Sequence, residues 1–287
     1  MNPADTTYLM GYGSWSIIRE RHGDEEPNIS SSFSNDDGEI LPLLSAEYSK
    51  SSNVPTASTY DTPLSSSTRS AIRLSSGTDS YSGSLSFEMT RQLSNLIFKE
   101  SFMRRRSFLD IRLCDGEAKI DILGAVWNSL SISGNSGQII SCSLGFNSCN
   151  GFKENIQVEE RPDLPERFLE LPNVEPYWKY GAEGAESFSL SFSRNVQPVY
   201  LNESDWKGPS YLRVGMLDVN FQIICWEKWF DHLSIALGNR KIKFNSSAFV
   251  SSRGYNFSGI QGNGTKSYSI NALGRDGDDQ IFKFEDN

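Results

Sequence analysis

The stretch of sequence that decides the fold is 126-VWNSLSISGNSGQIISCSLGF-146. In its first half Leu130 and Ile132 alternate with serines, and after a Gly-Asn-Ser-Gly turn Cys142 and Leu144 alternate with serines again. Successive side chains of a strand point to opposite faces, so this period of two places the apolar residues on one face and the hydroxyls on the other. The stretch predicts a β-hairpin with one buried face and one polar face.

A similar pattern returns near the C-terminus as 254-GYNFSGIQGNGTKSYSINALG-274. Placing Gly134 on Gly262, 128 residues further on, lays Ile132 on Ile260 and Cys142 on Ile270. Residues 84–103 and 217–237 also correspond, because each passes from alternating apolar residues into helical spacing. The two agreeing features predict one structural unit written twice.

These patterns predict a mainly β fold with two tandem β-barrel or sandwich units, each flanked by a short helix. Residues 1–150 would form the first unit and 187–287 the second, joined by a proline-bearing linker at 151–186. Within the first unit, residues 23–83 are dominated by Ser, Thr, Asn, Asp and Pro. Small apolar groups interrupt this segment, which favours a long arm that becomes ordered on a partner, with a mobile surface loop as the alternative.

The composition excludes several classes of function. The chain has 287 residues and a formal charge of −9, which disfavours a protein that grips nucleic-acid phosphates through clustered cations. No secretory signal and no apolar run long enough to span a membrane is present, so we expect no membrane partner. The four cysteines show no metal-ligand spacing and are expected to be reduced structural thiols, with a Cys142–Cys149 bridge as the alternative.

No catalytic constellation can be found in the sequence. The chain contains two histidines, and neither has a second His or Cys at metal-ligand spacing. A nucleophile elbow, a phosphate-binding loop and a dinucleotide fingerprint are all missing. We therefore expect a protein that is not an enzyme and that needs no metal or other cofactor.

Polar faces recur on the predicted strands at 84–89, 129–133, 141–144, 187–193 and 217–223. They are either the solvated face of an ordinary antiparallel sheet or the wall of a channel. The candidate lumen-facing residues are Glu88, Ser129, Ser131, Ser133, Ser141, Ser143, Asp218, Asn220 and Gln222.

A second group of residues is a candidate for contacts between subunits or rings. The apolar members lie in the predicted arm, and the basic members end the first predicted helix, where they either complement its dipole or contact an acidic neighbour. These candidates are Ile40, Leu41, Leu43, Leu44, Arg104, Arg105 and Arg106.

Most of residues 8–150 resembles the tail tube proteins of long-tailed phages. The resemblance rests on the order of three stretches, 12-YGSWSIIRERHG-23, 83-GSLSFEMTRQLSNLIF-98 and 125-AVWNSLSISGNSGQIISCSLGF-146. It implies a β-barrel or sandwich flanked by a helix, whose sheet joins those of neighbouring subunits into an inner barrel. It also implies that rings stack through a long loop, which residues 23–83 would supply.

What the resemblance implies about function is a structural virion protein whose stacked rings form a conduit for double-stranded DNA, which passes without specific binding. Two units per chain imply a homotrimeric ring with pseudo-sixfold symmetry, with a hexamer as the alternative. Expected partners are a terminator, a tape measure, and a baseplate or sheath, and expected location is the phage tail after assembly in the host cytoplasm. Alternatives are a tube-initiator, baseplate hub or terminator ring of the same fold, or a carbohydrate-binding β-sandwich.

Overall fold

A computed structural model of the 287-residue chain describes residues 5–10, 14–22, 38–53, 77–103, 107–114, 118–135, 138–155, 173–176, 185–201, 208–225, 233–237, 240–244, 249–257, 264–274 and 282–286. The elements are β1 (Asp5–Met10), β2 (Trp15–His22), β3 (Glu39–Asn53), β4 (Thr78–Glu88), α1 (Arg91–Ile97), α2 (Glu100–Met103), β5 (Ser107–Cys114), β6 (Lys119–Asn135), β7 (Ser141–Ser148), β8 (Phe152–Asn155), β9 (Asn173–Pro176), β10 (Ala185–Val199), β11 (Tyr211–Cys225), β12 (Leu233–Leu237), β13 (Arg240–Phe244), β14 (Phe249–Phe257), β15 (Gly264–Gly274) and β16 (Phe282–Asp286). The fold is mainly β, as the sequence predicts.

Six strands of the N-terminal half close into a barrel. They pair antiparallel in the order β6-β5-β2-β3-β4-β7, and β6 also pairs with β7, which closes the circle. The hairpin predicted at residues 126–146 is formed by β6 and β7, with Ile132 opposite Cys142 and Leu130 opposite Leu144. The predicted β-barrel is therefore confirmed for this half of the chain.

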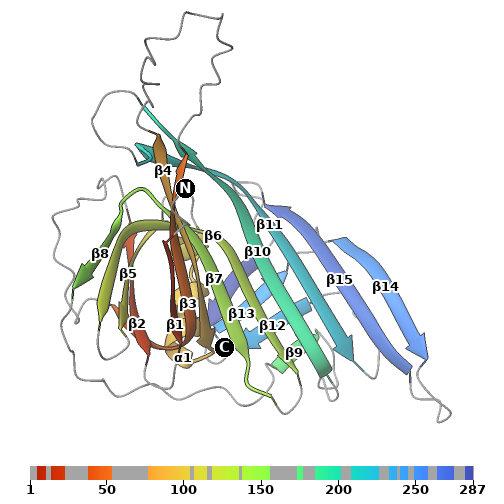
Figure 1. Ribbon diagram of the computed structural model, residues 1–287. Helices are drawn as coiled ribbons and strands as arrows, with labels where there is room; N and C mark the ends of the chain where they lie inside the picture. The colour runs from red at the N-terminus through yellow and green to blue at the C-terminus, as the bar shows by residue number, and fades with distance from the viewer. Residues whose placement is uncertain are drawn as a thin grey trace, which may run out of the picture.

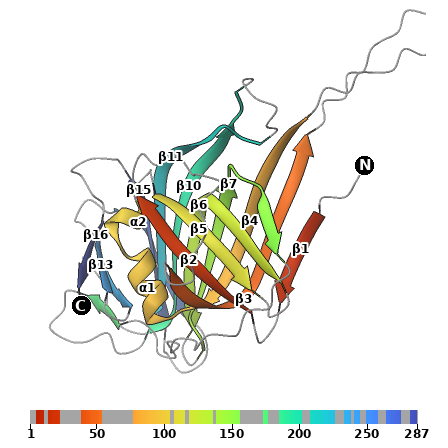
Figure 2. The same cartoon turned by 90° about the vertical axis from the view of Figure 1, so that its left-hand side faces the viewer.

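Four strands of the C-terminal half extend the sheet outward from the barrel. β10 pairs with β6, and β11, β15 and β14 follow in that order, so that they fan out side by side (Figure 1). β14 and β15 are the predicted C-terminal hairpin. A separate four-stranded sheet has the order β16-β13-β12-β9, and Figure 2 shows it on the same side of the molecule as α1 and α2.

The described buried side chains form one main cluster that spans both halves. The barrel contributes residues such as Leu130 and Trp127, which are fully buried, and the helices contribute Phe102, whose ring stacks on Trp127 at 5.6 Å. Phe192 of β10 and Phe221 of β11 belong to the same cluster. Burial of this continuous apolar face is the main force that holds β10 and β11 against the barrel.

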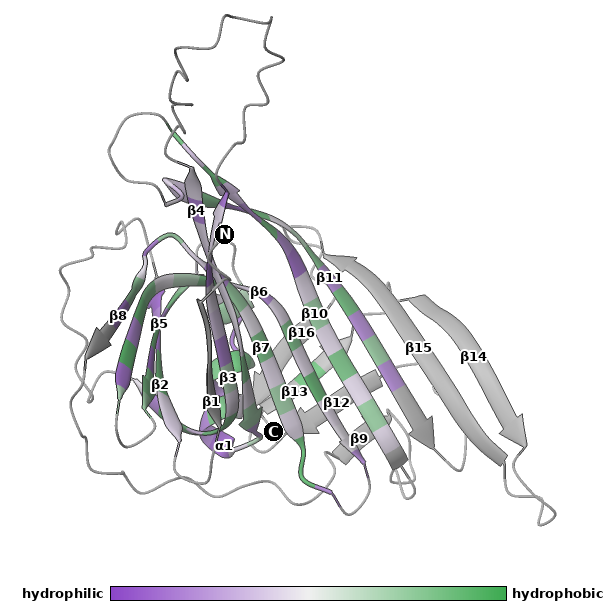
Figure 3. Cartoon of the chain, viewed as in Figure 1, coloured by the Kyte–Doolittle hydropathy of each residue, from purple (hydrophilic) through white to green (hydrophobic). Residues whose placement is uncertain are grey.

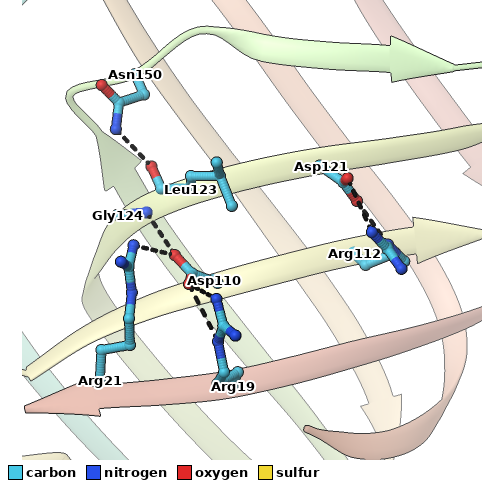
Figure 4. A network of polar contacts seen from close by, with 8 residues as sticks. All are labelled: Arg19, Arg21, Asp110, Arg112, Asp121, Leu123, Gly124 and Asn150. Atoms are coloured by element: carbon cyan, nitrogen blue, oxygen red, sulfur yellow. Dashed lines mark hydrogen bonds and ion pairs between the residues drawn. The ribbon is translucent and has the colours of Figure 1, made fainter. Parts of the chain in front are cut away.

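Buried ion pairs fix three barrel strands relative to one another (Figure 4). The carboxylate of Asp110 in β5 is fully buried and accepts hydrogen bonds from the Nη2 atoms of Arg19 and Arg21 in β2, at 2.7 and 2.6 Å. It also accepts from the backbone N–H of Gly124 in β6 at 2.9 Å. Gly124 has a φ of 65°, a left-handed conformation that glycine adopts without steric cost. Because its partners all come from neighbouring strands of the barrel, we assign the Asp110 carboxylate a structural role.

The structure corrects the prediction of a second helix. Residues 217–237 were expected to run from a strand into a helix, but Leu233–Leu237 is strand β12, which pairs with β9 and β13. Leu233, Ile235 and Leu237 also satisfy a period of two, and pairing with distant strands selects that alternative. The rest of the predicted helix, 226–232, lies outside the described residues.

The predicted arm at 23–83 is also corrected, because much of it is barrel. β3 and the first part of β4, residues 78–83, lie within the expected arm, and the two strands pair along their length. A bulge at Leu44 interrupts the alternation of β3, so the strand pattern is broken between Leu43 and Ala46. Residues 23–37 and 54–76 lie outside the described residues. Within the predicted linker, β8 pairs with β6 and β9 pairs with β12.

Candidate functional site

The register of the sheet places the predicted polar positions in three continuous rows. Each row crosses β11, β10, β6, β7 and β4, so it joins strands from both halves of the chain. Row A is Gln222, Ser189, Ser133, Ser141 and Glu88. Row B is Asn220, Ser191, Ser131, Ser143 and Ser86. Row C is Asp218, Ser193, Ser129, Gly145 and Ser84.

All nine candidate lumen-facing residues fall in these rows, so the fold brings together residues that are up to 134 positions apart in the sequence. We call the three rows the polar face. Five serines that were not among the candidates complete it, and the same alternation with apolar residues marks them. They are Ser84, Ser86, Ser189, Ser191 and Ser193.

Most positions of the polar face are exposed or half-buried. Ser129, Ser143 and Asp218 are exposed, and Ser131 and Asn220 are half-buried. The opposite side of the same strands is apolar and buried, which appears in Figure 3 as alternating colours along β10 and β11. The burial of that opposite side raises the pKa of the Cys142 thiol to about 12. Cys114, Cys142 and Cys149 are buried free thiols, so the alternative of a Cys142–Cys149 bridge is wrong.

Two positions of the polar face differ from the rest. Glu88 lies at the end of row A, but its side chain is only 6% exposed, so it presents little charge to solvent. Gly145 in row C has no side chain, and a Cβ built there would collide with the side chains of Ser129 and Asn128. The close approach occurs at the bulge between Trp127 and Ser129, where β6 changes the face that it presents.

A hollow of about 320 Å³ lies where row A meets the β6–β7 turn. Its lining includes Ser133, Ser141 and Ser189, together with the amides of Gln138 and Gln222. No titratable side chain lines it. The hydroxyl groups of Ser133 and Ser141 are 3.3 Å apart and can bond to each other. These groups offer neutral hydrogen bonds and no nucleophile–base pair.

The electrostatic character of the polar face is neutral to acidic. Its fifteen positions include no Lys or Arg, and Asp218 is the exposed acid among them. Hydroxyl and amide groups bind water well and attract phosphate weakly in the absence of cations. The arrangement can therefore present a wet wall to a polyanion without holding it.

The candidates for contacts between subunits are not one surface. Leu41 and Leu43 are buried in the core of their own chain, at 0% and 4% exposure, so the prediction that they contact another subunit is wrong for the chain as folded here. Leu41 and Leu43 are alternate residues of β3 and belong to the main core cluster. The interpretation of residues 23–83 as an arm did not take this alternation into account. Ile40 packs against a small cluster that contains Trp15, and Leu44 at the bulge is 44% exposed. Residues 104–106, the three arginines, lie outside the described residues.

Among the described residues, no group of three or more His, Cys, Asp or Glu side chains is placed to hold a metal ion. No described helix has both the length and the apolar character needed to cross a membrane.

No protein-family model matches the chain, and no curated protein matches it.

Proposed function

We propose that this chain is a structural protein whose copies form stacked rings, with the polar face lining a conduit for double-stranded DNA as in phage tail tubes. The observation that carries the proposal is the register of the polar face, which aligns hydroxyl and amide positions across five strands from both halves of the chain. The fifteen positions of the polar face include no Lys or Arg, whereas an ordinary solvated sheet face can carry basic residues.

The chemistry of the polar face suits a passage for DNA. Duplex DNA carries one negative charge per about 1.7 Å of axis, so a wall with clustered Lys or Arg would hold it through counterion release. The polar face has no cation, and the chain as a whole has a formal charge of −9. A wall of this kind repels phosphate weakly and keeps a layer of water between itself and the duplex.

The strand pairing supports a duplicated unit, and hence a trimeric ring with pseudo-sixfold symmetry. The antiparallel order β3-β4-β7-β6 in the N-terminal half recurs as β10-β11-β15-β14 in the C-terminal half. The short strands follow the same scheme. β8 pairs with the first residues of β6, and β16 pairs with β13, which precedes β14 in the chain as the first part of β6 precedes its second part. Two units per chain and three chains would present six equivalent sheets around one axis.

The resemblance of residues 8–150 to tail tube proteins agrees with this proposal. It fits a tube-initiator, hub or terminator ring of the same fold equally well, because each of these is a ring that DNA crosses. Copy number in the particle separates a tube protein, present in many stacked rings, from a protein present in a single ring. The parts of the expected stacking arm other than β3 and β4, residues 23–37 and 54–76, lie outside the described residues.

Electron microscopy of the purified protein tests ring formation. We expect rings with threefold or apparent sixfold symmetry, or short tubes, in negative stain at increasing protein concentration. Sedimentation velocity provides the matched measurement in solution. A protein that remains monomeric at all concentrations contradicts the proposal.

A charge substitution tests the role of the polar face. We expect assembled wild-type rings to bind duplex DNA no better than background in low salt. The double variant Asp218→Lys, Ser143→Lys changes two exposed positions and should bind DNA with an affinity that falls steeply with salt. Glu100→Lys is the control, because it changes an exposed acid on α2, away from the polar face. Equal DNA binding by the control, or none by the double variant, contradicts a lumenal polar face.

A further inference from the structure

The edges of two barrel strands are each shared by two shorter partners that lie end to end. On one edge of β6, β5 pairs with residues up to Ala125 and β10 pairs from Ser129 onward. On one edge of β3, β2 pairs up to Pro42 and β1 pairs from Ser45 to Lys50. β10 follows β5 along the edge of β6, and β1 follows β2 along the edge of β3, so β10 and β1 occupy corresponding places. Figure 1 shows β1 beside β3.

The two occupants differ in how firmly the rest of the fold holds them. β10 pairs with β11 on its other side and buries Phe188, Leu190 and Phe192 in the main cluster. β1 is six residues long and, among the described strands, pairs with β3 alone. A short strand with one neighbour loses few hydrogen bonds when it leaves, so opening at β1 costs less than opening at β10.

The other end of the large sheet exposes a strand edge. β14 pairs with β15, and within the described part of the chain no strand covers its other edge. Its sequence, FVSSRGYNF, has nine residues, no proline and a single charge, Arg253. Natural sheets protect long edges with charges, prolines or a cover, because an unprotected edge pairs with other chains. The edge of β14 has one charge and no proline, and its bulge lies near one end, between Val250 and Ser252. The stretch from Ser252 to Phe257 therefore has little protection of its own, which points to a cover supplied by another molecule.

We propose that β14 of one copy pairs with β3 of a second copy, on the stretch that β1 occupies in the isolated chain, and that β1 must leave for copies to join. The template is the junction within the chain. There β6 meets β10, and the repeated strand order makes β14 the counterpart of β6 and β3 the counterpart of β10. The inference rests on the proposed ring assembly and names the surface that builds it.

The geometry of this contact favours a ring. The contact joins two different edges, so an incomplete ring has an unpaired β14 at one end and an unjoined β3 at the other until the circle closes. A nine-residue strand would replace the six-residue β1, which extends the ladder. The competing arrangement, β14 against β14 of a second copy, is self-complementary, stops at a dimer and leaves β1 in place.

A disulfide that ties β1 to β3 tests whether β1 must leave. Thr6 and Ser49 are opposite each other in the register, so the variant Thr6→Cys, Ser49→Cys places two thiols across that pair. The matched control is Ser49→Cys, Ser82→Cys, which shares one position and ties β3 to β4, where the two hydroxyl oxygens are 3.3 Å apart. Full-length proteins are compared, oxidised and reduced, by sedimentation velocity and negative-stain microscopy.

We expect the oxidised Thr6→Cys, Ser49→Cys protein to remain monomeric and to assemble after reduction, while the control assembles in both states. Equal assembly of the oxidised and reduced forms overturns the inference and leaves the proposed rings intact. A dimer that the lock does not affect overturns it as well, in favour of β14–β14 pairing.

A deletion covers the case in which the wild-type chain does not assemble, an outcome that contradicts the proposed function. Removal of residues 1–10 takes away β1 and exposes the edge of β3. If the shortened chain then associates, β1 does cover an association edge and the inference stands apart from the ring. If it also remains monomeric, the inference is overturned together with the proposed function.

Discussion

The substitution Phe192→Ala tests whether β10 is built into the barrel core. Phe192 is 1% exposed and lies opposite Leu130 of β6 on one side and Val219 of β11 on the other. Both neighbours are themselves buried, at 0% and 2% exposure. The side chain therefore connects the barrel to the C-terminal strands through direct packing.

The magnitude of the effect follows from the cavity that the substitution leaves. Phe→Ala in a core costs about 3–5 kcal/mol, with larger values where the surroundings cannot collapse. Phe192 is enclosed by paired strands on both sides, so we expect about 4 kcal/mol. Domains are stable by roughly 5–15 kcal/mol, so this loss is a large share of the total.

Urea denaturation measures this loss. With a dependence on urea of about 3 kcal/mol per molar or more for a chain of this size, the midpoint should fall by roughly 1 M. Tryptophan fluorescence and far-ultraviolet circular dichroism should shift together, because Trp127 and Phe192 belong to one cluster. Ser191→Ala is the control, since it changes the neighbouring half-buried position on the polar face and should stay within about 0.5 kcal/mol.

Two results would refute this reasoning. If Phe192→Ala shifts the midpoint no more than Ser191→Ala, then β10 does not contribute its apolar face to the core. If the variant loses only a separate early transition while the barrel transition is unchanged, then the two halves unfold independently and the shared cluster does not couple them.

Two further predictions concern the barrel. Asp110→Asn should destabilise the protein by about 3–5 kcal/mol in urea, because it leaves the Arg19 and Arg21 guanidinium groups beside a neutral buried group. Lys50→Met removes a half-exposed cation from the buried Asp79, which keeps its hydrogen bond from the Ser52 hydroxyl, and it should cost less than Asp110→Asn. Equal effects of the two variants would contradict the role of burial. Burial raises the pKa of the Cys142 and Cys149 thiols to about 12 and about 11, so neither should react with a thiol reagent at pH 8 until urea unfolds the chain. Because burial raises both pKa values above the ordinary 9.0, the unfolded chain loses these thiol protons at a lower pH than the folded chain. The free energy of unfolding should therefore fall as the pH rises above about 9, up to about pH 11 for Cys149 and about pH 12 for Cys142, by up to about 1.4 kcal/mol per pH unit for each thiol. Rapid labelling of both thiols in the folded protein would contradict their burial.

The sequence alone determined the strands that carry a clear period of two. The hairpin of β6 and β7, the strands β4, β10 and β11, and the C-terminal hairpin were all predicted, because a strand with one buried face leaves an alternating record in its residues. The same record separated the polar face from the core. Each of the nine candidate residues could therefore be assigned to a side of its own strand before the sheet was known.

The sequence could not show which strands are neighbours. Three features depend on partners that are far away in the chain. They are the pairing of β2 with β3, the pairing of β10 with β6, and the strand at Leu233–Leu237, which pairs with β9. The bulge at Leu44 hid the alternation of β3, so part of the barrel was interpreted as an arm. Alternation is a local property of one strand, whereas register and closure are settled by the total apolar area that all strands bury together, and only the tertiary structure decides that.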